Sequence, residues 1–277
     1  MIKLFFFSAL SLNSIAAIFF FLYSYRQKGR LFNIATISLF FGTVFLGLML
    51  LISGLAKQRH PSTSTFESYN FLALLILIIY FVAEYKFKIR MLGTFLPPLA
   101  LFLNFLSFIT PNTSFQIEGV FSQTLFSIHT AFALLGEACF ALSFVASLMY
   151  LIQERHLKAK KFKGLFFRLP SLSTLEKTAS FSLLLGFPFL TVGLLLGFLL
   201  AAGTLGGNWV FDPKIIWTMI TWIVYSLLFM RRVSGQLRGR KFAWFLVIGF
   251  FLVIICYGAA NYFSSFHNFI YSFGANS

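Results

Sequence analysis

The sequence has little charge and few acidic residues. Only 10% of its 277 residues are charged, only seven are Asp or Glu, and 59% are hydrophobic. Because soluble domains carry about a quarter charged residues, this composition excludes a soluble globular protein. The only cysteines, Cys139 and Cys256, form no C-x-x-C pair, which excludes thiol–disulfide exchange and covalent cofactor attachment through such a motif. We expect both thiols to pack as small apolar side chains.

The sequence also lacks long stretches of alternating polar and apolar residues, and this argues against a membrane β-barrel. It has continuous apolar runs instead, and about 20 such residues suffice to cross a bilayer as a helix. Eight spans are predicted, at residues 4–25, 31–55, 69–85, 91–110, 121–152, 175–203, 213–230 and 242–262. We therefore expect an all-α polytopic membrane protein in which residues 1–277 form a single integral-membrane domain.

The basic residues are distributed unevenly along the chain. Eighteen of the 22 lysines and arginines fall in the loops after the first, third, fifth and seventh predicted spans. Loops rich in Lys and Arg remain in the cytoplasm, so this distribution places those four loops inside and both termini outside. The net charge of +15 is explained by topology, and we expect no nucleic-acid partner.

The loop between the sixth and seventh spans opens a tryptophan-rich segment, residues 206–222. It contains Trp209, Phe211, Asp212, Trp217 and Trp222. Tryptophan favours the membrane interface, where its ring is buried and its N–H remains hydrated. We therefore predict an aromatic platform at the outer membrane surface, suited to a large, flat, apolar ligand.

The tryptophan-rich segment resembles the WWD motif of the haem-handling cytochrome c assembly proteins. The matching residues are Trp209, Asp212, Pro213, Lys214, Trp217, Thr221 and Trp222. The segment departs from the motif in lacking its first Trp, in Phe211 replacing a further Trp, and in Ile215 standing where the family has Glu. The resemblance extends over the whole chain and is greatest to compact CcsA-like and HemX-like members.

Three of the four histidines, His60, His129 and His267, fall on the predicted outer side, as the tryptophan-rich segment does. His129 lies about 12 Å along the fifth span, and His267 follows the eighth. Neutral imidazoles can bind haem iron from opposite faces, and the family has one external histidine before the motif and one after the last span. We predict that His129 and His267 are axial ligands of haem. The alternatives are a helix–helix hydrogen bond for His129 and a solvated side chain for His267.

Further polar residues have two possible roles each. Residues 59–68 resemble a G-H-F-P-x-x-N-x-Y-E-S segment of the same family, so His60 is either a further haem-binding residue or a solvated loop residue. Asp212 either caps the seventh helix or supports a ligand histidine, and both roles are compatible. Glu137 in the fifth span either lines a haem path or accepts a hydrogen bond from a neighbouring helix. His156, among cytoplasmic cations, is expected to be a loop residue.

The resemblance implies a function in cytochrome c biogenesis. The protein would bind haem b at the outer, periplasmic face of the cytoplasmic membrane and present it to apocytochrome c. The absence of a C-x-x-C pair and of a large external domain implies a CcsB-like membrane partner, and the pair could form a cytochrome c synthase (haem lyase). One alternative is a HemX-like protein that influences haem biosynthesis. A secondary transporter or channel for an unrelated solute is an alternative of another class.

Overall fold

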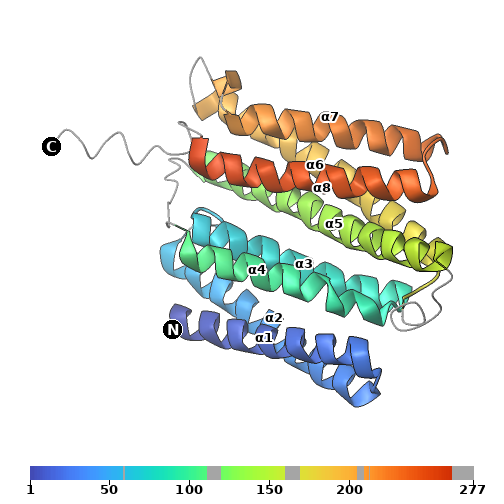
Figure 1. Ribbon diagram of the computed structural model, residues 1–277. Helices are drawn as coiled ribbons and strands as arrows, with labels where there is room; N and C mark the ends of the chain where they lie inside the picture. Colours follow the sequence, from blue (N-terminus) through green and yellow to red (C-terminus); the bar gives the residue numbers. More distant parts are fainter. Residues whose placement is uncertain (59, 111–119, 160–168, 205–208, 212, 264–277) are drawn as a thin grey trace.

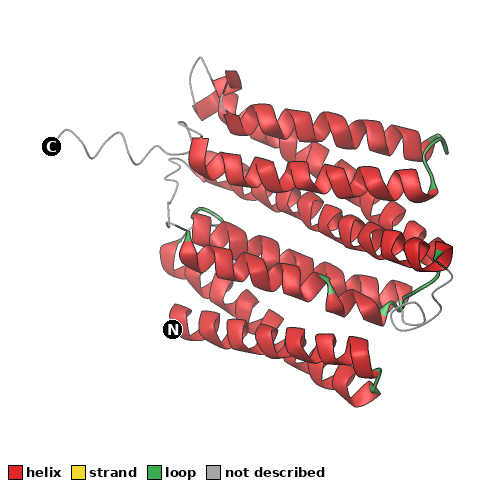
Figure 2. Cartoon of the chain, viewed as in Figure 1, coloured by secondary structure: helices red, strands yellow, loops and turns green. Residues whose placement is uncertain are grey.

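The computed structural model describes the chain except for residues 59, 111–119, 160–168, 205–208, 212 and 264–277. Side chains at residues 120–122, 204, 209, 213, 214 and 256–263, which border these gaps, are likewise not described. The described residues are helical, without strands (Figure 2), as the continuous apolar runs predict. The predicted fold class, an all-α membrane protein, is confirmed.

Eight long helices account for the eight predicted spans. They are α1 (Ile2–Arg26), α2 (Gly29–Lys57), α3 (Thr65–Phe87), α4 (Leu96–Ile109), α5 (Val120–Lys158), α6 (Leu172–Thr204), α7 (Pro213–Val233) and α8 (Gly239–Phe263), with short 3₁₀ turns η1 (Arg90–Thr94) and η3 (Trp209–Phe211). Within the described residues, seven helical segments are long and apolar enough to cross a membrane: α1 to α7, with η1 and α4 counted together.

The fourth predicted span is the one whose local structure differs from a single helix. It is divided at Phe95 into η1 and the 14-residue helix α4. Pro97 and Pro98 occupy the first turn of α4, where the missing N–H groups would have no partner within the helix. Because a proline there lacks the N–H that would continue the hydrogen bonds of an earlier turn, the helical hydrogen bonding is interrupted before α4.

The helices run antiparallel in two groups (Figure 1). Helices α1 to α4 pack on one another, and α5 to α8 form the second group. The groups meet mainly where α3 packs on α5. The predicted site residues on α5, η3 and α7 therefore belong to the second group.

One end of the second group is fixed by an arginine. Arg232 Nη1 on α7 donates to Glu176 Oε1 on α6 at 2.6 Å and to the carbonyl of Leu237 at 3.0 Å. Its guanidinium also lies 4.6 Å from the ring centroid of Phe242 on α8. These contacts tie three helices together at the basic end of the bundle. The opposite ends of α5 to α7 are the ones predicted to face outward, and they are called the outer ends below.

In the first group, α1 and α2 approach closely at a glycine. Asn13 of α1 is 1% exposed, and its side-chain oxygen occupies the space that a Cβ at Gly42 of α2 would fill. Small residues allow membrane helices to pack with their backbones close together. Gly42 therefore makes room for a buried amide between the two helices.

This contact predicts a clear difference between two glycines of α2. Gly42→Ala should destabilise the protein by about 1–3 kcal/mol, because the added methyl overlaps Asn13 in a packed interface. Gly47→Ala is the matched control, since the nearest atom to a Cβ there is 3.9 Å away. Unfolding titrations of the two purified variants measure the difference, and equal stabilities would contradict the packing argument.

Candidate functional site

Helices α5 and α6 form a close antiparallel pair lined by small residues. A Cβ at Gly136 would lie 2.8 Å from the backbone nitrogen of Leu190, and one at Gly193 would lie 2.7 Å from that of Ala133. Because the two helices are antiparallel, each step toward lower residue numbers on α5 corresponds to an equal step toward higher numbers on α6. The same register brings Gly197 opposite His129, one turn nearer the outer end of the pair.

His129 lies in this helix–helix contact, in the outer part of α5. Its Nδ1 is 2.6 Å from the carbonyl oxygen of Gly193, and its ring also lies 6.5 Å from that of Phe126. A carbonyl accepts and cannot donate, so Nδ1 carries the proton of the neutral ring and the lone pair resides on Nε2. The helix–helix hydrogen bond that was the alternative role for His129 is therefore present. It also puts the lone pair on Nε2, the form of a ring nitrogen that binds metals.

Helix α7 directs one tryptophan of the segment toward α6. Trp222 Nε1 donates to Thr191 Oγ1 at 3.1 Å, and its ring lies 6.0 Å from that of Phe187. Trp222 is nine residues after the first residue of α7, about 14 Å along the helix. The indole N–H of Trp222 therefore has a protein acceptor within the span. Trp217, one and a half turns nearer the outer end of α7, is partly buried.

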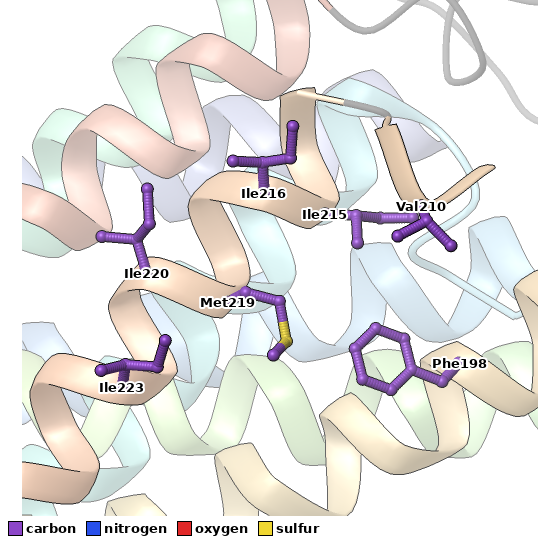
Figure 3. A pocket seen from close by; sticks show the side chains of 7 residues that line it. All are labelled: Phe198, Val210, Ile215, Ile216, Met219, Ile220 and Ile223. Carbon is purple, nitrogen blue, oxygen red and sulfur yellow. The ribbon is translucent and has the colours of Figure 1, made fainter. Parts of the chain in front are cut away.

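The 3₁₀ turn before α7 exposes apolar surface. Phe211 is 75% exposed and Val210 is 52% exposed. A groove of about 320 Å³ opens beside this turn (Figure 3), with walls that are aliphatic except for one phenylalanine. Its lining residues are Phe198, Val210, Ile215, Ile216, Met219, Ile220 and Ile223. Apolar clefts of this size accept small ligands, so the first turns of α7 offer an apolar surface that faces α6 at Phe198.

Several predicted residues fall in the parts of the chain that are not described. His267 and Asp212 lie outside the described residues, and the side chain of Trp209 is not described. Two predicted residues from different helices contact α6. His129 of α5 hydrogen-bonds to Gly193, and Trp222 of α7 hydrogen-bonds to Thr191. Pro213 does begin α7, as predicted for a proline at the first helical position.

His60 lies in the loop between α2 and α3, in the first group of helices. Its Nδ1 is 2.7 Å from Ser62 Oγ, and its ring meets the ring of Phe71 edge-on at 5.5 Å. Burial lowers the pKa of His60, and the negative charge of Glu67 opposes this only in part. The imidazole therefore remains neutral, the form that binds metals, to lower pH than a solvated histidine.

Glu67, to which the sequence analysis assigned no role, is the centre of a buried polar network next to His60. Its carboxylate is 1% exposed and accepts hydrogen bonds from Lys57 and Ser53, each at 2.6 Å, and from Thr63 at 3.3 Å. Its backbone N–H donates to Ser64, the N-cap of α3. A lone acid at the start of a predicted span, three residues after a serine, is the signal of such a cap.

Two asparagines and a serine extend the polar contacts along α3 and α4. Asn70 Nδ2 donates to Ser107 Oγ at 2.9 Å, and Asn104 Nδ2 donates to Asn70 Oδ1 at 2.8 Å. All three side chains are buried. Such contacts fix the register of α3 and α4, on which the loop carrying His60 rests.

Glu137 lies two turns deeper than His129 on α5. It is partly buried. The Tyr225 ring stacks on Phe140 with ring centroids 3.7 Å apart, so these two side chains of α7 and α5 meet below His129. The expectation that His156 is a loop residue was wrong: α5 extends to Lys158 and includes His156, whose Nδ1 lies 3.0 Å from the Ile152 carbonyl oxygen of the preceding turn. Cys139 is buried, as predicted.

Metal-ligating side chains do not gather in one place within the described parts of the chain. No group of three or more His, Cys, Asp or Glu residues there could hold a metal ion. His129 and His60 also lie in different groups of helices. Any iron bound through His129 would therefore need its other contacts from the undescribed residues or from the ligand itself, as the porphyrin of haem supplies.

Comparisons with known proteins give a consistent result. The family described as "Cytochrome C assembly protein" matches residues 2–267. The chain is 27% identical to the cytochrome c biogenesis protein CcsA of Trieres chinensis over 268 residues, which cover 85% of this chain and 84% of that protein. It is also 27% identical to CcsA of Guillardia theta over 239 residues (79% and 78%). Identity to the protein HemX of Brevibacillus brevis is 27% over 243 residues (87% and 89%).

Proposed function

Because the chain belongs to the cytochrome c assembly protein family, with a role in cytochrome c biogenesis, we propose that it binds haem b and presents it to apocytochrome c. Haem is the cargo of this protein. It would lie at the outer face of the cytoplasmic membrane, between His129 and His267 as axial ligands and against the tryptophan-rich segment. The chain contributes binding, orientation and ligation, and the thioether bonds form between haem vinyl groups and cysteines of the apocytochrome.

The environment of His129 is the observation that carries this proposal. An ionisable side chain inside a membrane span is costly, and such residues mark ligand or ion pathways. Here the Nδ1–H donates to a backbone carbonyl, which fixes the ring and puts the lone pair of the neutral ring on Nε2, the nitrogen that would bind iron. The adjacent outer end of α7 supplies an apolar surface for the porphyrin.

The part of the chain that the structure describes is a helical bundle without a separate folded domain. We therefore include a CcsB-like membrane partner in the proposal, with which this chain would act as a cytochrome c synthase. His60, neutral and half-buried beside Phe71, is proposed as a further haem-contacting residue. It lies in the other group of helices, so its contact would be with haem at another stage of transfer.

A HemX-like role is the second candidate. The alignment with HemX covers 87% of this chain and 89% of that protein, and Phe211 and Ile215 depart from the motif of haem-delivering members. A protein in this role would influence haem biosynthesis without supplying cytochromes. Deletion of the gene distinguishes the two candidates: loss of mature cytochrome c supports delivery, and a change in haem-synthesis enzymes with normal cytochrome c supports the HemX-like role.

The haem proposal predicts a coloured protein whose haem depends on Trp217. The purified protein should show a Soret band, and Trp217→Ala should reduce haem content several-fold because aromatic surface against the porphyrin is lost. Trp244→Ala is the matched control, since Trp244 is 47% exposed on α8, outside the segment. A colourless protein that haem cannot reconstitute would instead favour a transporter of another solute.

The proposed outer location of the site predicts a labelling pattern. Single cysteines placed at residues 111–120 or in the C-terminal tail should react with a membrane-impermeant maleimide in intact cells. Cysteines at residues 158–163 should react only after permeabilisation, because the basic loops remain inside. External labelling of residues 158–163 would place His129 and the tryptophan-rich segment on the wrong side for the proposed delivery.

A further inference from the structure

We infer that Gly197 of α6 is a positioning residue that sets the orientation of His129 and the ring nitrogen it presents. The inference rests on the proposed function, since His129 meets iron only there. A Cβ at Gly197 would lie 2.6 Å from Cε1 and 2.8 Å from Nδ1 of His129. Both distances are far below van der Waals contact, so the His129 ring occupies the space that any side chain at position 197 would need.

Gly197 also exposes the acceptor that holds the ring. In an α-helix, the side chain of a residue covers the turn before its own Cα. Position 197 is one turn after Gly193, whose carbonyl oxygen accepts from His129 Nδ1 at 2.6 Å. A side chain at position 197 would cover that carbonyl. The missing side chain thus makes room for the ring and gives it access to its acceptor.

The hydrogen bond determines which nitrogen can bind iron. With Nδ1–H donating to Gly193, the lone pair of the neutral ring is on Nε2. A histidine ligand whose other nitrogen donates to a carbonyl is fixed in tautomer and orientation and is more basic toward the metal. Loss of this bond should reduce metal affinity by about 10- to 100-fold, as for other groups that orient ligands.

Gly197 differs from the other small residues of the α5–α6 contact. At Gly193 and Gly136, an added Cβ would meet backbone atoms of the facing helix, so substitution there would separate the helices. At Gly197, the three atoms nearest to an added Cβ all belong to the His129 ring. Gly197→Ala is therefore expected to displace the ring while the helix pair remains intact, which separates positioning from packing.

A double-mutant cycle on the protein without haem tests the contact directly. Gly197→Ala should lower Tm by a few degrees, on the order of 5 °C, when His129 is present, and should leave it unchanged or raised in a His129→Ala background. Gly203→Ala is the control on the same helix, because nothing lies within 4 Å of a Cβ there. An equal effect of Gly197→Ala with and without His129 would overturn the inference.

Chemical rescue tests the assigned nitrogen. In a His129→Gly variant, added imidazole should restore the six-coordinate haem spectrum, with one nitrogen on iron and its N–H donating to Gly193. 1-Methylimidazole carries a methyl in place of that N–H and should restore it at least about tenfold less well. Equal rescue by both would overturn the inference. A wild-type protein that binds no haem would defeat the proposed function instead, while the double-mutant cycle would still decide the role of Gly197.

Discussion

Replacement of His129 by alanine is expected to remove at least about nine-tenths of the bound haem, and replacement of His267 should do the same. Loss of one axial ligand leaves a five-coordinate iron, and a bond worth more than about 1.4 kcal/mol already corresponds to a tenfold change in affinity. The double variant should be little worse than the worse single variant, because both changes act on one site.

The measurement is the absorption spectrum of purified protein together with the amount of mature cytochrome c in the cell. Added imidazole should partly restore both single variants, since a free ring can occupy the vacated position. His156→Ala is the control, because His156 lies at the opposite end of α5 from His129. A wild-type spectrum and normal cytochrome c in both His129→Ala and His267→Ala would refute the two-histidine site.

Replacement of Lys57 by alanine is expected to destabilise the protein by about 2–3 kcal/mol. The Glu67 carboxylate is 1% exposed, so without Lys57 it would be a buried charge held only by hydroxyls. Removing one partner of a buried ion pair costs about 3–5 kcal/mol, and the 38% exposure of Lys57 reduces this figure through solvent screening. The unfolding free energy in detergent gives the value.

A second substitution tests the reason for this loss. Glu67→Gln in the Lys57→Ala background should recover part of the stability, because a neutral amide needs no cation but can still accept from Ser53. Lys158→Ala provides a control on an exposed ion pair, with 61% of the Lys158 side chain accessible, and should cost less than about 1 kcal/mol. Further destabilisation in the double variant would show that Glu67 is not a buried charge that depends on Lys57.

The sequence was sufficient for the helices because a membrane allows few alternatives. Backbone groups in the bilayer must be satisfied internally, so each continuous apolar run becomes a helix, and all eight predicted spans are found as such. The 3₁₀ turn before α4 was missed, although Pro97 and Pro98 were the signal: apolar residues continue through the break, and hydropathy does not register a change of backbone geometry.

The candidate site was only partly accessible to the same reasoning. Trp222 was grouped with the surface tryptophans, but it points toward α6, where Thr191 accepts its N–H. The direction of a side chain on a wholly apolar helix depends on which face meets a neighbour, and hydrophobic periodicity carries little of this information when lipid and protein interiors are equally apolar. Glu67 was undervalued because its partners come from α2 and from the loop before α3.

The sequence by itself determined the class of the protein and its family, because these depend on composition, on order along the chain and on motifs. The tertiary structure alone decided which nitrogen of His129 holds the proton, why position 197 is glycine and how Glu67 is neutralised. Gly193 is 64 residues from His129 in the sequence. Only the antiparallel register of α5 and α6 brings that carbonyl within hydrogen-bond distance of the ring, and register is a property of packed helices rather than of either helix alone.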